Sequence, residues 1–161
     1  MKIIEYDNKY EEDVKDLLVE LEEYIISIDK DNLDQIGKNY REEMIKSDLE
    51  EVNSNNGKCY LAVEDKKAIG LIMGYIVKYE KSDYLDYKCP KKGRISELIV
   101  SKNTRSKGIG RKLMNKMEEY FKSNECKYIS VEVFSYNENG IRFYKNNNYH
   151  TRCIDMIKEI N

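Results

Sequence analysis

Residues 95–121 (ISELIVSKNTRSKGIGRKLMNKMEEYF) constrain the fold of this chain more than any other stretch. The stretch begins with a β-prone run that includes Ile95 and residues 98–100 and that starts two residues after Gly93. It ends with apolar residues at spacings of three and four, which form one face of a helix. These residues are Ile109, Leu113, Met117, Tyr120 and Phe121. The pattern predicts a strand, a polar turn over residues 101–110 and an amphipathic helix.

Gly108 and Gly110 lie at the predicted junction between the turn and the helix. Glycines let the backbone approach a ligand closely, and the first N–H groups of a helix have no partner within it. The positive end of the helix dipole and nearby basic side chains also favour an anion. A structural turn without a ligand is the alternative. We predict a diphosphate site made by Arg105, Ser106, Lys107, Gly108, Ile109, Gly110, Arg111 and Lys112.

The turn resembles a known motif. It lacks the Gly-Lys-Ser/Thr of a P-loop and the third glycine of a dinucleotide fingerprint. The pattern Arg105-x-x-Gly108-x-Gly110 closely resembles R/Q-x-x-G-x-G/A, the pyrophosphate motif of the GNAT superfamily of acyl-CoA N-acyltransferases. The resemblance implies acetyl-CoA as cosubstrate. It also implies that the exposed backbone of Leu98, Ile99 and Val100 pairs with the pantetheine amides and polarises the thioester carbonyl.

A second motif follows, Asn137-x-x-Gly140-Ile141-x-Phe143-Tyr144-x-x-x-Asn148-Tyr149. It resembles the family signature N-x-x-A-x-x-F/L-Y-x-x-x-G-F/Y, with glycine and asparagine in place of the alanine and glycine. The resemblance implies that Asn137 contacts the pantetheine arm or orients the tyrosine, and that Tyr144 protonates the departing thiolate. A phenol can supply such a proton. Core packing is the alternative for Tyr144, since the chain has 14 tyrosines.

The attacking amine must lose a proton, for which a carboxylate is the usual acceptor. Glu97 is the first candidate, because it lies on the predicted strand beside the expected thioester position. Glu132 on the following strand is the second candidate. An ordinary solvent-facing or paired carboxylate is the alternative for Glu97, and alternation does not show which face of the strand meets the substrate.

Composition places the chain in the class of soluble globular proteins with a highly charged exterior. A length of 161 residues fits one domain over residues 1–161. There is no apolar run of membrane-spanning length and the N-terminus becomes acidic at once, which excludes a membrane span and a signal peptide. The four cysteines form no C-x-x-C pair and there is one histidine, so no metal site is expected. We expect a cytoplasmic monomer or homodimer.

The charge is divided unevenly along the chain. Residues 1–56 carry 17 acidic and 7 basic side chains, whereas residues 57–161 carry 13 acidic and 21 basic side chains. The division indicates two ligand environments of opposite sign, although solvated helix faces are the simpler explanation. Nucleic acid is not an expected partner, because the basic residues alternate with hydrophobic segments and the net charge is −2.

The remaining chain completes an α/β fold of the mixed α+β kind. We predict strands at 2–6, 58–64, 68–79, 95–100, 127–134 and 149–160, and helices at 10–28, 39–52, 109–121 and 137–147. The order is β-α-α-β-β-β-α-β-α-β, with an antiparallel hairpin in the middle and a parallel step near the end. The family resemblance implies the same splayed mixed sheet flanked by helices.

These patterns lead to one function and two rivals. The sequence predicts an acetyl-CoA-dependent N-acetyltransferase that acts by direct attack of a primary amine. The acidic N-terminal part predicts a cationic acceptor, such as a polyamine, an aminoglycoside, a lysine side chain or an N-terminal amine. The first rival is a non-catalytic acyl-CoA-binding module. The second rival is a nucleic-acid-binding protein that uses the basic later part.

Overall fold

A computed structural model describes residues 1–105 and 107–160 of the chain. The strands are β1 (Lys2–Glu5), β2 (Lys58–Glu64), β3 (Lys67–Ile76), β4 (Lys92–Val100) and β5 (Tyr128–Val131). The helices are α1 (Glu11–Ile28), α2 (Tyr40–Ser54), α3 (Ile109–Ser123) and α4 (Glu138–Asn146). Short 3-10 turns lie at Asn8–Tyr10, Asp83–Leu85 and Lys102–Thr104.

The strands form one sheet in the order β1-β2-β3-β4-β5. The first four strands pair antiparallel, and β5 pairs parallel to β4. This confirms the predicted mixed sheet, its central hairpin and its parallel step. The pairing of β4 with β5 covers only residues 92–95 of β4. Among the described residues, no strand pairs with residues 96–100 of β4 on that side.

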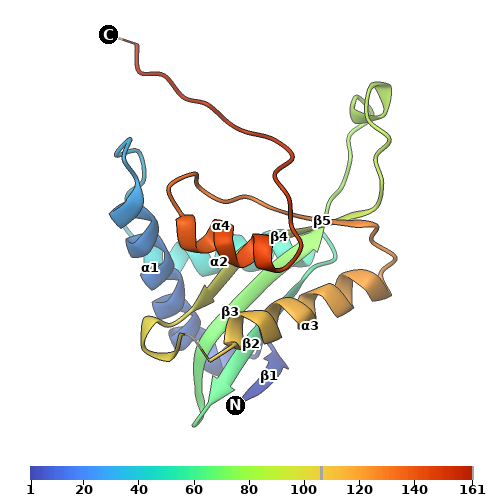
Figure 1. Cartoon of the computed structure of the whole chain (residues 1–161). Helices are drawn as coiled ribbons and strands as arrows, with labels where there is room; N and C mark the ends of the chain where they lie inside the picture. Colours follow the sequence, from blue (N-terminus) through green and yellow to red (C-terminus); the bar gives the residue numbers. More distant parts are fainter. Residues whose placement is uncertain (106, 161) are drawn as a thin grey trace.

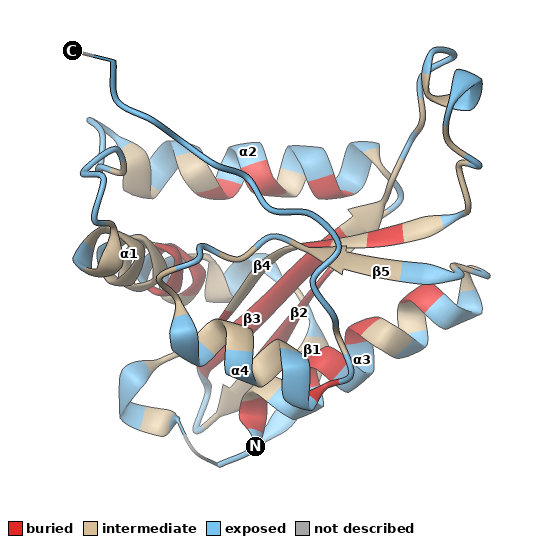
Figure 2. Ribbon diagram, turned by 45° about the horizontal axis from the view of Figure 1, so that its top comes forward, coloured by how far each residue is buried: buried red, intermediate tan, exposed pale blue. Residues whose placement is uncertain are grey.

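Helices cover both faces of the sheet (Figure 1). The helices α1 and α2 pack on one face, where Val14, Leu18, Ile45, Leu71 and Ile99 belong to one buried apolar cluster. The helix α3 packs on the other face, in a second cluster to which α4 and the residue after it contribute partly buried rings. Figure 2 shows the most buried residues along the central strands and on the sheet-facing sides of α1, α2 and α3.

A bulge in β4 changes which residues face each side of the sheet. Met73 pairs with Glu97 and Gly74 pairs with Ile95, so that Ser96 is one extra residue in β4. Ile95 therefore faces the α3 side, where it is buried. Glu97, opposite Met73, faces the side that α1 and α2 cover. Without the bulge, two residues that are two apart would face the same side.

The predicted C-terminal strand at 149–160 is wrong. Residues 150–160 form no strand or helix and are exposed, including the large apolar side chains of Ile154, Met156 and Ile160. Figure 1 shows this segment running away from the sheet. A strand needs a partner, and the edge strand β5 has only four residues. Two other strands are shorter than predicted, because β3 ends at Ile76 and β5 at Val131.

Close packing of α3 on β4 gives the first prediction. A Cβ atom on Gly93 would lie 2.6 Å from atoms of the Phe121 ring, which is only 1% exposed and has no room to move. We expect Gly93→Ala to lower the free energy of unfolding by about 1–3 kcal/mol, measured by urea denaturation. Gly37→Ala is the matched control, because a Cβ atom there meets nothing within 4 Å. Equal stability of the two variants would contradict this packing.

Candidate active site

The N-terminus of α3 presents free backbone donors. Gly108 is the N-cap residue with a φ of 72°, a left-handed conformation that glycine adopts without strain. The first helical hydrogen bond runs from the Lys112 N–H to the Gly108 carbonyl at 3.2 Å. The N–H groups of residues 109–111 donate to no backbone acceptor among the described residues. A Cβ atom on Gly108 would meet nothing within 4 Å, so this side of the turn is open. The donors fit an anionic diphosphate.

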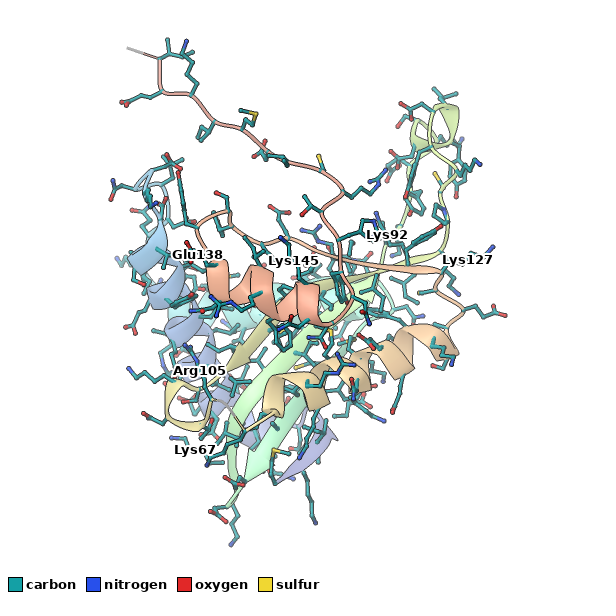
Figure 3. The ribbon with its side chains drawn as sticks, viewed as in Figure 1. Lys67, Lys92, Arg105, Lys127, Glu138 and Lys145 are labelled. Carbon is teal, nitrogen blue, oxygen red and sulfur yellow. The ribbon has the colours of Figure 1, made fainter. Side chains whose placement is uncertain are left out.

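Two of the predicted phosphate ligands contact the protein itself. The Arg105 side chain donates to the Val100 carbonyl at 3.0 Å, and its guanidinium lies 5.6 Å from the centre of the Tyr24 ring. Figure 3 shows Arg105 beside the turn that joins β4 to α3. Arg111 donates to the side-chain carbonyl of Asn147, just after α4. Both arginines therefore hold the turn and α4 in place.

The other predicted phosphate ligands lie at the surface of the turn. Lys107 and Lys112 are exposed and form no ion pair within the described part of the chain. The Ile109 side chain is buried, so Ile109 can contact a ligand through its backbone N–H. Ser106 lies outside the described residues. Lys107, Lys112 and the backbone donors thus provide the positive side of the site.

Two residues of α1, which the sequence analysis missed, support the turn. The Glu20 carboxylate accepts hydrogen bonds from the Lys102 N–H at 2.6 Å and the Ser101 hydroxyl at 3.2 Å. One helical turn later, the Tyr24 hydroxyl donates to the side-chain carbonyl of Asn137 at 3.1 Å. The only available signal was their spacing of four on one face of the helix. Their contacts join α1 to both predicted motifs.

Asn137 is the N-cap residue of α4. Its side-chain carbonyl accepts a hydrogen bond from the Gly140 N–H at 2.8 Å, in addition to the bond from Tyr24. A Cβ atom on Gly140 would lie 2.7 Å from the side-chain nitrogen of Asn137. This close approach explains why residue 140 is glycine here, whereas the family signature has alanine at the corresponding position.

The part of β4 that β5 does not pair with has side chains on both faces of the sheet. Ile99 is buried on the α1 and α2 side. Leu98 and Val100 lie on the α3 side, in the same apolar cluster as Phe143 and Tyr144 of α4. The geometry therefore leaves the β5 side of this backbone open for a ligand to pair with, although Arg105 already occupies the Val100 carbonyl.

Tyr144 is a residue of α4, and its side chain is partly buried against the apolar cluster on the α3 side of the sheet. Its ring packs edge-on against Phe143 at 5.3 Å and against Tyr149 at 5.5 Å between ring centres. Burial raises the pKa of Tyr144, and the negative charge of Glu97 raises it further. The phenol therefore keeps its proton at neutral pH, as a proton donor requires.

Glu97 and Glu132, the two candidate bases, have different environments. Burial, followed by the charges of Asp48, Glu22 and Glu51, raises the pKa of Glu97 to about 8. The Glu132 side chain is 81% exposed and pairs with Arg94 at 2.7 Å. Glu97 therefore has the perturbed, sheltered carboxyl that is typical of a catalytic base, and Glu132 does not.

Glu97 belongs to a group of acidic residues that we call the acidic cluster, formed by Glu22, Asp48 and Glu97. Asp48 was not predicted; it is only 8% exposed, and burial, followed by the charge of Glu51, raises its pKa to about 6. The Tyr40 hydroxyl donates to Glu22 at 3.4 Å, and burial, followed by the charges of Glu22 and Glu97, raises the pKa of Tyr40. The cluster combines residues of α1, the middle of α2 and β4.

Comparisons with known proteins agree with this geometry. A sequence model of the acetyltransferase (GNAT) family matches residues 21–149. The chain therefore belongs to this family, and it is an acyltransferase of the acetyl-CoA-dependent N-acetyltransferase class. No curated protein sequence matches it.

Solved structures share the fold over nearly all of the chain. A variant of the BH1408 protein from Bacillus halodurans has a TM-score of 0.79 at 18% identity, covering 100% of this chain and 99% of that one. Glucosamine-6-phosphate N-acetyltransferase from Arabidopsis thaliana has a TM-score of 0.68 at 20% identity, with 99% and 98% covered. An aminoglycoside N-acetyltransferase in complex with CoA has a TM-score of 0.68 at 14% identity, with 99% and 100% covered.

No helix in the part of the chain that the structure describes is long and apolar enough to cross a membrane. The same part of the chain contains no group of three or more His, Cys, Asp or Glu residues that could hold a metal ion.

The buried carboxyl of Asp48 gives a prediction for stability. Its pKa is about 6 in the folded protein against an ordinary value of 3.8, so the unfolded chain loses the proton first. The contribution of Asp48 to stability should therefore fall as the pH rises from about 4 to about 6 and change no further above that interval, whereas Glu97, whose pKa is about 8, continues to lower the stability of the parent up to about pH 8. We expect Asp48→Asn to be more stable than the parent by about 1–3 kcal/mol at pH 8, and nearly equal at pH 3.5, in urea denaturation.

Asp31→Asn is the control for this stability measurement, because Asp31 is exposed. We expect it to follow the parent at both pH values. A constant difference between Asp48→Asn and the parent at both pH values would contradict the elevated pKa of Asp48.

Proposed function

We propose that the chain transfers an acetyl group from acetyl-CoA to a primary amine of a cationic small molecule. One observation carries the proposal: the part of β4 that β5 does not pair with contains Glu97, and its Leu98 and Val100 lie in the same apolar cluster as Tyr144 of α4. The charge of Glu97 also raises the pKa of Tyr144. A base and an acid therefore lie near the same stretch of open backbone.

The binding half of the proposal assigns acetyl-CoA to the α3 end of β4. The backbone donors of residues 108–111, with Lys107 and Lys112, hold the diphosphate. The open backbone of residues 98–100 pairs with the pantetheine amides, and Arg105, Arg111 and Asn137 act by fixing the turn and α4. The assignment is supported by the open side of Gly108 and by the missing partner strand.

The chemical half follows from the two side chains. Acetyl-CoA supplies an acyl thioester whose carbonyl carbon accepts a nucleophile. Glu97 accepts a proton from the acceptor nitrogen, whose lone pair forms the new N–C bond. The C–S bond breaks with its electron pair on sulfur, and Tyr144 gives its proton to that sulfur. A proton passed from Glu97 to Tyr144 through solvent restores both residues, so the products are the acetylated amine and the free thiol of CoA.

The acidic first part of the chain supports a cationic acceptor. Residues 1–56 include β1, α1 and α2 and carry ten more acidic than basic side chains. The helices of this part cover the sheet face on which Glu97 lies. A cleft with negative charge raises the local concentration of cations. A lysine side chain or an N-terminal amine carries the same charge and is the alternative acceptor within this proposal.

Replacing Tyr144 tests the proposal against a non-catalytic acyl-CoA-binding module. We expect Tyr144→Phe to lower kcat by about 100-fold or more, because the departing thiolate loses its proton donor. Binding of CoA, measured by calorimetry, should be unchanged. Tyr128→Phe, on an exposed ring, is the control and should retain full activity. No turnover by the parent with any amine would favour the binding module.

The pKa of Glu97 predicts a pH profile. As a base, Glu97 acts in its ionised form, so kcat/KM should rise with pH and level off above about 8. In Glu97→Gln this rise should disappear and the activity should fall. The acceptor should be an amine whose own pKa lies well below 7, so that it is neutral throughout and its ionisation does not add to the rise. A rise near pH 8 that persists in Glu97→Gln would rule out this role.

A further inference from the structure

The helix α4, which carries Tyr144, is anchored less firmly than the other helices. None of residues 138–146 is buried, whereas α1, α2 and α3 each have at least three buried residues. The C-terminal end of α4 is fixed, because the next residue, Asn147, is 9% exposed and accepts a hydrogen bond from Arg111. The N-terminal end depends on other contacts.

The N-terminal end of α4 is held by α1 and by the residue that follows its C-cap. The Tyr24 hydroxyl donates to the side-chain carbonyl of Asn137, the N-cap residue, at 3.1 Å. The Lys30 ammonium lies 4.6 Å from the centre of the Tyr136 ring, one residue earlier. Lys30 is exposed, whereas the bond from Tyr24 is partly buried and therefore less weakened by water. Tyr24 is thus the stronger of the two links.

This hydrogen bond joins the layers on the two faces of the sheet. The helix α1 packs on one face, and α4 contributes Phe143 and Tyr144 to the cluster on the α3 face. The start of α4 lies beside α1 in both ribbon views (Figures 1 and 2). The two layers can meet there because β5 does not pair with residues 96–100 of β4.

The ring of Tyr24 contacts the other half of the site. The Arg105 guanidinium lies 5.6 Å from the ring centre, and the Arg105 side chain also donates to the Val100 carbonyl. Glu20, one helical turn earlier, lies 3.7 Å from the same guanidinium and accepts a hydrogen bond from the Lys102 N–H. Figure 3 shows Arg105 on the same side of the molecule as the start of α4. One side chain therefore contacts the phosphate turn through its ring and α4 through its hydroxyl.

Resting on the function proposed above, we propose that Tyr24 is a positioning residue that keeps the two halves of the acetyl-CoA site in register. Its hydroxyl holds Asn137 and the start of α4, and thereby places Tyr144 for proton donation. Its ring holds Arg105, and thereby the turn that binds the diphosphate. Different atoms of one side chain carry the two roles, so two substitutions at this position separate them.

Tyr24→Phe removes the hydroxyl and keeps the ring. We expect kcat to fall by about 10-fold, the worth of one partly buried hydrogen bond. KM for acetyl-CoA and the Kd for CoA, measured by calorimetry, should not change. The helix α4 keeps its cap in this variant, because Asn137 still accepts the hydrogen bond from the Gly140 N–H.

Tyr24→Leu removes both the hydroxyl and the aromatic ring. We expect the same fall in kcat and, in addition, a rise of about 2- to 5-fold in KM for acetyl-CoA, the worth of one cation–π contact. Tyr10→Phe is the matched control, because Tyr10 precedes α1 directly and packs against the apolar cluster on the other side of the sheet from Tyr144. The control should change neither constant.

The same substitution in a Tyr144→Phe background separates positioning from a general structural role. If Tyr24 acts through Tyr144, its hydroxyl has no proton donor to place in that background. We therefore expect Tyr24→Phe to lower kcat there by less than about 2-fold, because residues that act as a unit are not additive. A structural role would lower kcat by the same factor in both backgrounds.

The outcomes distinguish the role of Tyr24 from the proposed function. Unchanged kcat in Tyr24→Phe, or equal losses in both backgrounds, would overturn the positioning role and leave the acetyltransferase proposal in place. A KM for acetyl-CoA that rises as much in Tyr24→Phe as in Tyr24→Leu would overturn the division between ring and hydroxyl. A parent that acetylates no amine would overturn both proposals.

Discussion

The arrangement of this protein depends on the separation of β4 from β5 after four paired residues. The bulge at Ser96 begins at the same point, and it turns Glu97 toward the α1 and α2 side while Leu98 and Val100 remain on the α3 side. A fully paired sheet would bury the backbone that a substrate needs. Because β5 separates from β4 after residue 95, the backbone of residues 96–100 stays accessible, and side chains from the helices on both faces of the sheet can reach it.

Electrostatics adds the second constraint. Glu97 and Asp48 are sheltered carboxyls, and burial raises the pKa of each. Lys15 pairs instead with Glu12 and Glu42, in a different part of the α1–α2 interface. Such groups destabilise the folded protein when they ionise. The catalytic base and the cationic acceptor that we propose would give this cost a function, since a ligand charge would restore the balance that the protein lacks.

Local signals in the sequence predicted much of the fold and part of the site. The strand, glycine turn and helix around Gly108 depend on neighbouring residues, as does the cap at Asn137, and the structure has both. The predicted strand at 149–160 is absent from the structure, because strand pairing depends on a distant partner that the local sequence does not report. Tyr24 and Asp48 were missed for the same reason, since their contacts arise only when α1 and α2 pack against the rest of the chain.

The central claim is that an acyl thioester lies between Glu97 and Tyr144 along the open part of β4. A crystal structure of the chain with CoA tests it most directly. The account predicts the diphosphate at the N–H groups of residues 108–111 and the thiol sulfur within hydrogen-bond distance of the Tyr144 hydroxyl. A CoA molecule that places its sulfur away from both side chains, or its diphosphate away from α3, would contradict the account.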